Sequence, residues 1–312
     1  MILAVSLNPA LDVTHHVAKV DWSGVNRPRE VHATPGGKGL NVARTLRALG
    51  CDVLVVGLAG GVTGEAVSTG LDEAGVPSRF SQVAGETRRT FAVVDLARHD
   101  AALFNEPGPT VSADEYKEFL VLYEECLAWC SAVVLSGSLP PGLPQDSYAG
   151  LAARAAAAAV PVVLDAGGPA LRHGAAAGPA IAKPNLAELA AAVGRPLAGL
   201  AAAVSAAAEL QTAGARAVVV SLGGDGLLAV TGDGTWHAVP PGRVAGNPTG
   251  AGDAVVAGLA HGLVLGRPWA ERLRHAAALG TACGAAPAAG QVAEADYRRA
   301  LAGTEVTEWA DR

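Results

Sequence analysis

Cysteine is scarce in this sequence of 312 residues, and its four copies form no CxxC pair. A disulfide framework or a structural zinc site requires cysteines in closer groups, so neither is indicated. Cys126 and Cys130 are one helical turn apart on an apolar segment, and we interpret them as small buried hydrophobic residues. The pattern is typical of a reducing compartment, and we expect a cytoplasmic protein.

Long apolar runs and basic runs are also absent. Charge, proline or glycine clusters interrupt every window of about 18 to 20 residues, so we expect no membrane-spanning helix. The opening residues "MILAVSLNPALD" lack a basic region and become polar too early for a signal peptide. With a net charge of −6 and no stripe of Lys and Arg, the sequence gives no support to a nucleic-acid partner. Hydrophobic residues make up 50% of the chain, which argues against disorder.

Short apolar runs alternate with segments rich in alanine and leucine. The runs are continuous, as in strands buried on both faces, and they lie at residues 1–7, 52–58, 131–137, 160–166, 179–185 and 217–223. This alternation predicts an α/β fold with an open, mostly parallel sheet flanked by helices. Ligands of such sheets bind beyond the carboxyl ends of the strands. The polar residues that follow the runs are therefore candidates for a site: Asn8, Asp12, Ser136, Ser138, Asp165, Asn185 and Ser221.

Two segments, at about 12–33 and 88–108, instead alternate polar and apolar residues. This period of two predicts a small antiparallel sheet with one face in water. No low-complexity linker or repeat divides the chain. We therefore predict a single domain over residues 1–312, with the small sheet inserted as an appendage.

A glycine-flanked turn, Gly250-Ala251-Gly252, directly precedes Asp253 and an apolar run of helical character. No G-x-x-x-x-G-K-[ST] loop is present, and no G-x-G-x-x-G follows a strand and opens a helix. Free N–H groups at a helix start bind anions, and phosphoryl transfer needs such donors. Asp253 would then accept the proton of the attacking hydroxyl. An acid in a first turn can also simply complement the helix dipole; the bare turn favours the catalytic role.

A second glycine-rich stretch, "TPGGKGLNVARTLRALG", opens another predicted helix at residues 34–50. Gly36, Gly37 and Gly39 would let a ligand approach the backbone, and Asn41 lies in the first turn. A cation such as Lys38 at a helix N-terminus is unfavourable by roughly 0.3–1 kcal/mol. An anionic ligand would remove that conflict, although Lys38 can also be a solvated side chain.

A third element, "KPNLAEL", places Asn185 and Glu188 three residues apart at a helix start. This spacing forms a capping box. The same two residues would suit a hydrated Mg²⁺ ion, which binds few carboxylates and keeps its waters. The sequence leaves both interpretations open.

With these motifs in place, the chain resembles the ribokinase/PfkB family of sugar kinases over nearly its whole length. "PGGKGLNVARTLRALG" and "NPTGAGDAVVAGLAHGL" are similar to the family's two signatures, in the right order and spacing. "SLNPALDVT", "VNR", "GETR", "SGSLPPG", "KPNLAE" and "SLGGDG" resemble the branch that phosphorylates ketohexose phosphates: the 1-phosphofructokinases, the tagatose-6-phosphate kinases and the minor 6-phosphofructokinase type. The implied fold is a ribokinase-like three-layer sandwich whose small antiparallel sheet is a lid over the sugar.

The resemblance also implies roles for particular residues. Asp253 would be the base, and Gly250, Ala251 and Gly252 would form the anion hole. The sugar hydroxyls would contact Asp12, Gly36, Gly37 and Asn41, and the sugar's existing phosphate would contact Arg27, Lys38, Arg88 and Ser138. ATP would lie near Lys183, Asn185, Ser221, Gly223 and Gly226, and Mg²⁺ near Asn185 and Glu188. The lid would also pair two subunits in a homodimer.

One departure from the branch follows Arg88 and Arg89, where Thr90, Phe91 and Ala92 replace the Asn and Lys common in 1-phosphofructokinases. A phosphate-binding cation is thus missing or supplied by Arg89. We expect an ATP- and Mg²⁺-dependent kinase acting on tagatose 6-phosphate, fructose 1-phosphate or fructose 6-phosphate. The alternatives are a kinase of an unphosphorylated sugar or nucleoside, and a non-catalytic sugar-phosphate sensor.

Overall fold

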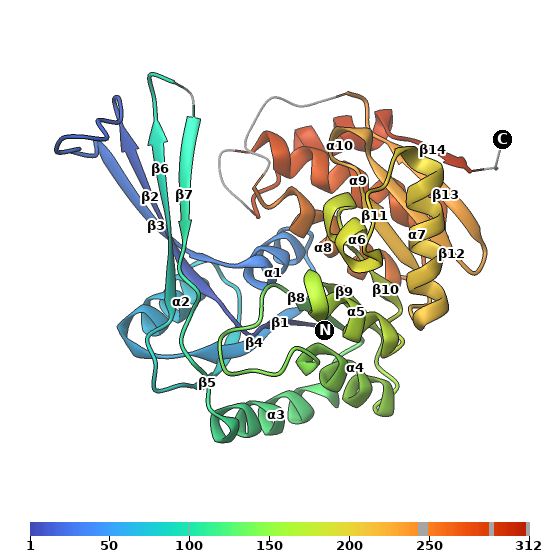
Figure 1. Ribbon diagram of the computed structural model, residues 1–312, viewed down its shortest axis with the longest axis horizontal. Coiled ribbons are helices and arrows are strands. Elements are labelled where there is room, and N and C mark those ends of the chain that lie inside the picture. Colours follow the sequence, from blue (N-terminus) through green and yellow to red (C-terminus); the bar gives the residue numbers. More distant parts are fainter. Residues whose placement is uncertain (99, 243–248, 287–289, 310–312) are drawn as a thin grey trace.

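The computed structural model describes residues 1–98, 100–242, 249–286 and 290–309. Its main feature is a large sheet with the strand order β14-β13-β12-β11-β10-β9-β8-β1-β4-β5 (Figure 1). The seven strands from β11 to β5 in this order run parallel, and β12, β13 and β14 extend the sheet with antiparallel pairs. The strands of this sheet are β1 (Ile2–Ser6), β4 (Val53–Ala59), β5 (Ser78–Gln82), β8 (Ala132–Ser136), β9 (Val162–Asp165), β10 (Ile181–Ala182), β11 (Val218–Ser221), β12 (Leu227–Thr231), β13 (Gly234–Val239) and β14 (Glu305–Glu308). All six predicted apolar runs are strands of this sheet, so that prediction is confirmed.

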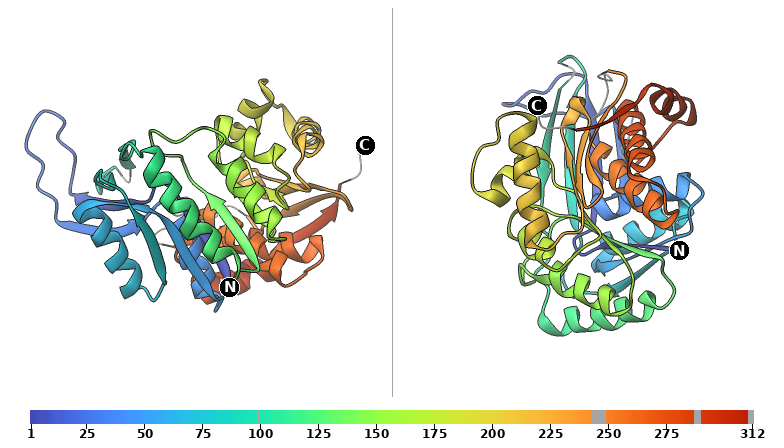
Figure 2. Two further views of the ribbon diagram at one scale, coloured as in Figure 1. Left: turned by 90° about the horizontal axis from the view of Figure 1, so that it is seen from below. Right: turned by 90° about the vertical axis from the view of Figure 1, so that its right-hand side faces the viewer.

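Helices cover both faces of the sheet in two layers (Figure 2, right). One layer packs on the core that contains Leu3 and Val5, and it consists of α3 (Ala113–Leu127), α4 (Ser147–Ala157), α5 (Gly168–Ala176), α6 (Leu186–Val193) and α7 (Gly199–Ala213). The other packs on the core that contains Ile2 and Ala4, and it includes α1 (Lys38–Ala48), α2 (Gly61–Glu73), α8 (Ala251–Val264) and α9 (Trp269–Ala285). Because successive strand residues point to opposite faces, β1 supplies both cores, and its residues Ile2 to Val5 are all apolar. The α10 helix (Glu294–Gly303) packs on α9, and a short 3₁₀ helix, η1, spans Gly223–Asp225.

The predicted α1 helix begins and ends where its sequence signals lie. Its N-cap Gly37 has φ 100°, a conformation that a residue with a Cβ atom adopts only with strain. Leu40, Val42 and Leu46 are among its buried residues. Gly50, which follows the C-cap Leu49, has φ 74°, a conformation common just after a helix.

The second sheet, which we call the lid, stands away from the main body (Figures 1 and 2). Its strand order is β3-β2-β6-β7, with the strands β2 (Ala10–Val17), β3 (Glu30–Gly36), β6 (Arg88–Asp95) and β7 (Asp100–Asn105). The expected antiparallel pairing is present within β2–β3 and within β6–β7. The central pair, β2–β6, is parallel, because two hairpins from separate insertions meet there, and the sequence pattern did not indicate it.

Several of the polar residues singled out after the strands lie at one edge of the main sheet. Asn8, Ser138 and Asp165 follow or end neighbouring parallel strands, whose carboxyl ends share that edge, and Lys183 follows β10 there. Asp12 instead lies within lid strand β2. No helix within the described ranges is long and apolar enough to cross a bilayer.

Candidate active site

The start of α8 carries a buried carboxylate. Gly250 is the N-cap with φ 85°, no side chain caps the helix, and Asp253 lies in the first turn. Asn247 and Pro248, which precede this turn in the signature, lie outside the described residues. Backbone N–H groups of a first helical turn have no partner within the helix, so this end can bind an anion.

Two lysines and a second carboxylate lie beside this helix start. Asp165, at the end of β9, is 1% exposed and pairs with Lys183 Nζ at 3.1 Å and Lys38 Nζ at 3.4 Å. It also accepts a hydrogen bond of 3.0 Å from Ser136 Oγ. Burial alone would raise the pKa of Asp165, but the two ammonium groups hold it below its usual value. The same carboxylate, together with Glu188 at 3.6 Å, raises the pKa of Lys38 above its usual value against the effect of burial.

These neighbours set the pKa of the Asp253 carboxyl group. Burial, and then the negative charge of Asp165, raise the pKa of Asp253 to about 7. A hydrogen bond from Asn41 and the charges of Lys38 and Lys183 act in the opposite direction. A general base works best when its pKa is near the working pH, so this carboxylate is suited to accept a proton.

Asn41 is held between a cation and the candidate base. Its Nδ2 donates to Asp253 Oδ2 at 2.7 Å, and its Oδ1 accepts from Arg44 Nη2. Because a guanidinium can only donate, Arg44 determines which amide atom faces Asp253. The second amide hydrogen of Asn41 has no acceptor among the described residues.

A cavity of about 850 Å³ lies next to this helix start. Its lining includes Asn8, Arg88 and Ser138 together with Lys38 and Glu188. Arg88 enters from the first residue of lid strand β6. The structure thus brings Lys38, Arg88 and Ser138, expected around a phosphate, to one cavity. Asp253 lies beside Lys38 and is not among the residues that line it.

Asp12 and the glycines of the first signature lie together at the lid base. A Cβ atom on Gly36 would lie 2.0 Å from Asp12 Oδ2, so only glycine lets this carboxylate approach the backbone. Burial raises the pKa of Asp12. Asp12 and Arg88 lie on paired strands, β2 and β6.

The structure does not bring Arg27 or Arg89, the other two arginines considered for the phosphate, to this cavity. Arg27 is exposed in the loop between β2 and β3. Arg89 lies over the ring of Phe91 and pairs with Glu106 at 3.9 Å. Because neighbouring strand residues point to opposite faces, Arg89 cannot point with Arg88.

On the other side of Lys38, the capping box of α6 is confirmed. Asn185 Oδ1 accepts from Glu188 N at 2.8 Å, and Glu188 Oε2 accepts from Asn185 N at 2.8 Å. The Glu188 Oε1 atom faces Lys38. Ser221, at the end of β11, forms an isolated parallel β-bridge with Asn185. These residues adjoin the site through Lys38 and Lys183.

Gly223 and Gly226, expected near a nucleotide, form the turn after β11. Gly223 has φ 63° and open space where a Cβ would lie. Gly226 has φ 91°, and a Cβ there would lie 1.9 Å from the carbonyl oxygen of Ala238. Gly226 is therefore required by the approach of β13, and Gly223 leaves room above the strand end.

Sequence reasoning assigned no role to Asp165, Arg44 or Asn8. Asp165 and Asn8 carried a signal, since each follows a buried strand. Arg44 carried none, because a single basic residue in a helix is usually solvated. Its burial beside Asn41 depends on the way α1 packs against α8.

A buried carboxylate at a glycine-flanked helix start, with two lysines beside it, is suited to an enzyme that transfers a phosphoryl group. Residues 6–293 match the pfkB family carbohydrate kinases. The chain is 37% identical over 289 residues to the 1-phosphofructokinase of Bacillus subtilis (strain 168), with 92% of each chain covered. The chain therefore belongs to the pfkB family of carbohydrate kinases.

Solved structures agree with this assignment. The tetrameric inhibited form of phosphofructokinase-2 from Escherichia coli superposes with a TM-score of 0.88 at 30% identity, covering 96% of this chain and 98% of that chain. The Arabidopsis thaliana ribokinase complexed with ribose and ATP, at 22% identity and a TM-score of 0.75, covers 96% and 98%. The latter likeness shows that the fold is ribokinase-like, as expected.

Proposed function

We propose that this kinase uses ATP to phosphorylate a ketohexose monophosphate to the bisphosphate. The observation that carries this proposal is the cavity in which Arg88, Ser138 and Lys38 meet beside the α8 start. A free sugar has no anionic group for these side chains, whereas a phosphosugar does. Similarity to a 1-phosphofructokinase and to phosphofructokinase-2 supports the same substrate class.

In the proposed reaction, Asp12 and Asn41 hold the sugar hydroxyls. Asp253 takes the proton of the attacking hydroxyl, whose oxygen bonds to the γ-phosphorus of ATP while the bond to the β,γ-bridging oxygen breaks. ADP is the leaving group. The amides of Gly250, Ala251 and Gly252 stabilise the charge on the transferred group. The lid excludes water, the competing acceptor.

The nucleotide would lie near Lys183, Asn185, Ser221, Gly223 and Gly226. A dedicated protein cage for a metal is not present in the described part of the chain, where no three His, Cys, Asp or Glu side chains gather. Mg²⁺ does not need one, because it keeps waters and binds substrate phosphates. Glu188 Oε1, free of the capping box, fits this role with Asn185 beside it. The ion would neutralise charge on the nucleotide phosphates.

The decisive experiment is a substrate panel with coupled detection of ADP. Fructose 1-phosphate, fructose 6-phosphate and tagatose 6-phosphate are compared with free fructose, free tagatose and a nucleoside. Turnover of a phosphosugar supports the proposal. Turnover of unphosphorylated acceptors alone overturns it, and thermal stabilisation by a phosphosugar without ADP release indicates a sensor.

Removal of the Lys38 ammonium group should weaken phosphosugar binding. Hydrogen bonds to charged groups contribute about 1.5–3 kcal/mol, so Lys38→Ala is expected to raise the phosphosugar KM by about tenfold or more. Stability should change little because Lys38 is 41% exposed and Asp165 retains Lys183. Initial-rate kinetics measure this, with the exposed Lys117→Ala as the charge-matched control. An unchanged KM would speak against the role of Lys38.

The pH profile should report Asp253. Its carboxylate accepts a proton only when ionised, and its pKa is about 7. We expect kcat/KM to rise with pH and to level off above about 7. The substrate phosphate also titrates, with a pKa of about 6. Asn41→Leu distinguishes Asp253 from the substrate phosphate as the titrating group. Loss of the hydrogen bond to Asp253 should move the rise of kcat/KM to higher pH only if Asp253 causes that rise.

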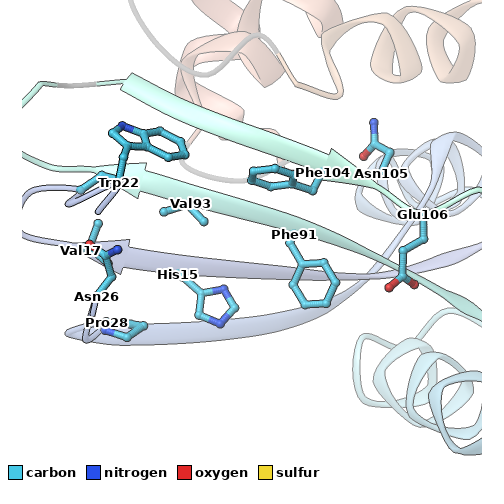
Figure 3. A pocket seen from close by; sticks show the side chains of 11 residues that line it. His15, Val17, Trp22, Asn26, Pro28, Phe91, Val93, Phe104, Asn105 and Glu106 are labelled. Carbon is cyan, nitrogen blue, oxygen red and sulfur yellow. The ribbon is translucent and has the colours of Figure 1, made fainter. Parts of the chain in front are cut away.

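We further propose that the lid pairs with the lid of a second copy. One face of the lid forms an apolar hollow of about 630 Å³ that includes His15, Phe91 and Val93 (Figure 3). At its rim, Trp22 is 73% exposed and Phe104 is 53% exposed. Exposed apolar surface of this kind is typical of an interface, and the related phosphofructokinase-2 is known in a tetrameric form.

A charge on this face should dissociate the pair. Phe104→Glu is expected to convert a dimer into monomers in size-exclusion chromatography with light scattering, because an unpaired buried charge is costly. Leu103→Glu is the matched control, since Leu103 is 60% exposed but its side chain points to the opposite face of β7. Dissociation by both variants, or by neither, would contradict pairing through this face.

A further inference from the structure

Asn8 joins three parts of the chain that surround the proposed phosphate subsite. It lies just beyond β1 and is 6% exposed. Its Nδ2 donates to the carbonyl oxygen of Pro107 at 3.0 Å and to Ser138 Oγ at 3.1 Å. The backbone carbonyl oxygen of Asn8 accepts from Arg88 Nε at 3.1 Å. Pro107 follows lid strand β7, so a single residue ties the lid to the loop after β8.

The polarity of these hydrogen bonds is determined. A carbonyl oxygen can only accept, so the amide nitrogen of Asn8 must face Pro107. That nitrogen has two hydrogens and gives the second to Ser138, whose hydroxyl therefore acts as an acceptor. A hydroxyl also carries one hydrogen of its own. No acceptor within the described ranges takes it, and Ser138 is exposed in the cavity.

The amide of Asn8 also leaves one atom unsatisfied. Asn8 Oδ1 is buried and has no hydrogen-bond partner among the described residues. It packs against Gly108, where a Cβ atom would lie 2.2 Å away. A buried unpaired acceptor destabilises a fold, and such a group in a native protein requires an explanation. Orientation of Ser138 supplies one.

We propose that Asn8 is a positioning residue that directs the hydroxyl hydrogen of Ser138 to the substrate's existing phosphate, and so sets the preference for a phosphorylated sugar. This inference rests on the proposed function. Arg88 Nε donates to the backbone oxygen of Asn8, and Nη1 donates to the backbone oxygen of Glu106 at 3.4 Å. Its Nη2 is then left for the same substrate phosphate. The subsite then offers an oriented neutral donor and a fixed cation.

A double-mutant cycle on the full-length enzyme tests the inference. Asn8→Ala and Ser138→Ala are each expected to raise the KM of the preferred phosphosugar by about tenfold, with kcat and the KM of ATP within about twofold. The phosphosugar KM of the double variant should be less than about twofold above that of Ser138→Ala, because the two side chains act through one hydrogen bond. Asn8→Asp should raise the phosphosugar KM more than Asn8→Ala does, since a carboxylate would accept the hydroxyl hydrogen of Ser138 itself.

One further variant distinguishes positioning from general damage. Thr87→Val removes another buried side chain at the lid base, whose Oγ1 accepts from Gly60 N at 2.9 Å, and it should leave the phosphosugar KM within about twofold of wild type. Additive effects of Asn8→Ala and Ser138→Ala, or an unchanged KM for Asn8→Ala, overturn the inference while the kinase proposal stands. A wild-type enzyme that turns over no phosphosugar overturns both.

Discussion

Asp253→Asn should lower kcat by about 10²–10⁴-fold, the range for loss of a general base, while the protein remains folded. The amide keeps an oxygen for the hydrogen bond from Asn41, which is 2.7 Å from Asp253 Oδ2 in the wild type. It cannot take up a proton from the attacking hydroxyl. Initial rates at saturating phosphosugar and ATP measure the loss, and a kcat near that of wild type would refute the base assignment.

The same substitution should stabilise the protein at alkaline pH. The pKa of Asp253 is about 7 in the folded protein against an ordinary value of 3.8. Between these values the folded state holds a proton that the unfolded chain has released, so wild-type stability falls as pH rises and the loss is complete above about 7. Asparagine does not titrate. The variant should therefore have a higher Tm than wild type at pH 8, and the difference should shrink toward pH 4.

A matched substitution separates this role from a simple effect on the helix dipole. Asp114 lies in the first turn of α3 and is exposed. If Asp253 only complemented the dipole of α8, Asp253→Asn and Asp114→Asn would behave alike, with small losses of stability and full activity. We expect Asp114→Asn to retain full turnover and to show no stabilisation at pH 8.

Lys183→Met should lower the free energy of unfolding by about 3–5 kcal/mol, because it leaves a buried charge without its main partner. Lys183 is 4% exposed and lies 3.1 Å from Asp165, which is 1% exposed. Lys38, at 3.4 Å from the same carboxylate, compensates only in part. Urea unfolding at pH 8 measures the change.

Two variants test the origin of that loss. Lys183→Met combined with Asp165→Asn should recover much of the stability, since no buried charge is then left unpaired. Arg154→Met removes a surface pair, Arg154–Glu124 at 2.8 Å, and should cost about 1 kcal/mol or less. A loss for Lys183→Met as small as that for Arg154→Met would contradict the argument.

Loss of Lys183 should also reach the proposed base. Its ammonium group lowers the pKa of Asp253, so its removal should move the rising limb of the pH profile above about 7. A variant that unfolds more easily but keeps the limb in place would show that Lys183 stabilises the fold without adjusting Asp253.

The amino-acid sequence by itself determined the layered architecture and which segments form the buried parallel strands. Continuous apolar runs such as 1–7 and 52–58 can be buried only between two layers of helices, and Gly37 and Gly250 mark backbone conformations that few other residues adopt. Polar residues placed after such strands must meet at one edge, which is why Ser138 and Asp165 were visible as candidates.

Only the tertiary structure decided which of these polar residues touch. Asn41 and Asp253 are 212 residues apart in the chain, and their hydrogen bond exists because α1 and α8 pack on the same face of the sheet. The parallel β2–β6 pair likewise joins two insertions and carries Arg88 to Asn8. Periodicity specifies the face on which a side chain lies. Contacts between distant segments, and the pKa values that they set, depend on packing and burial that no local pattern encodes.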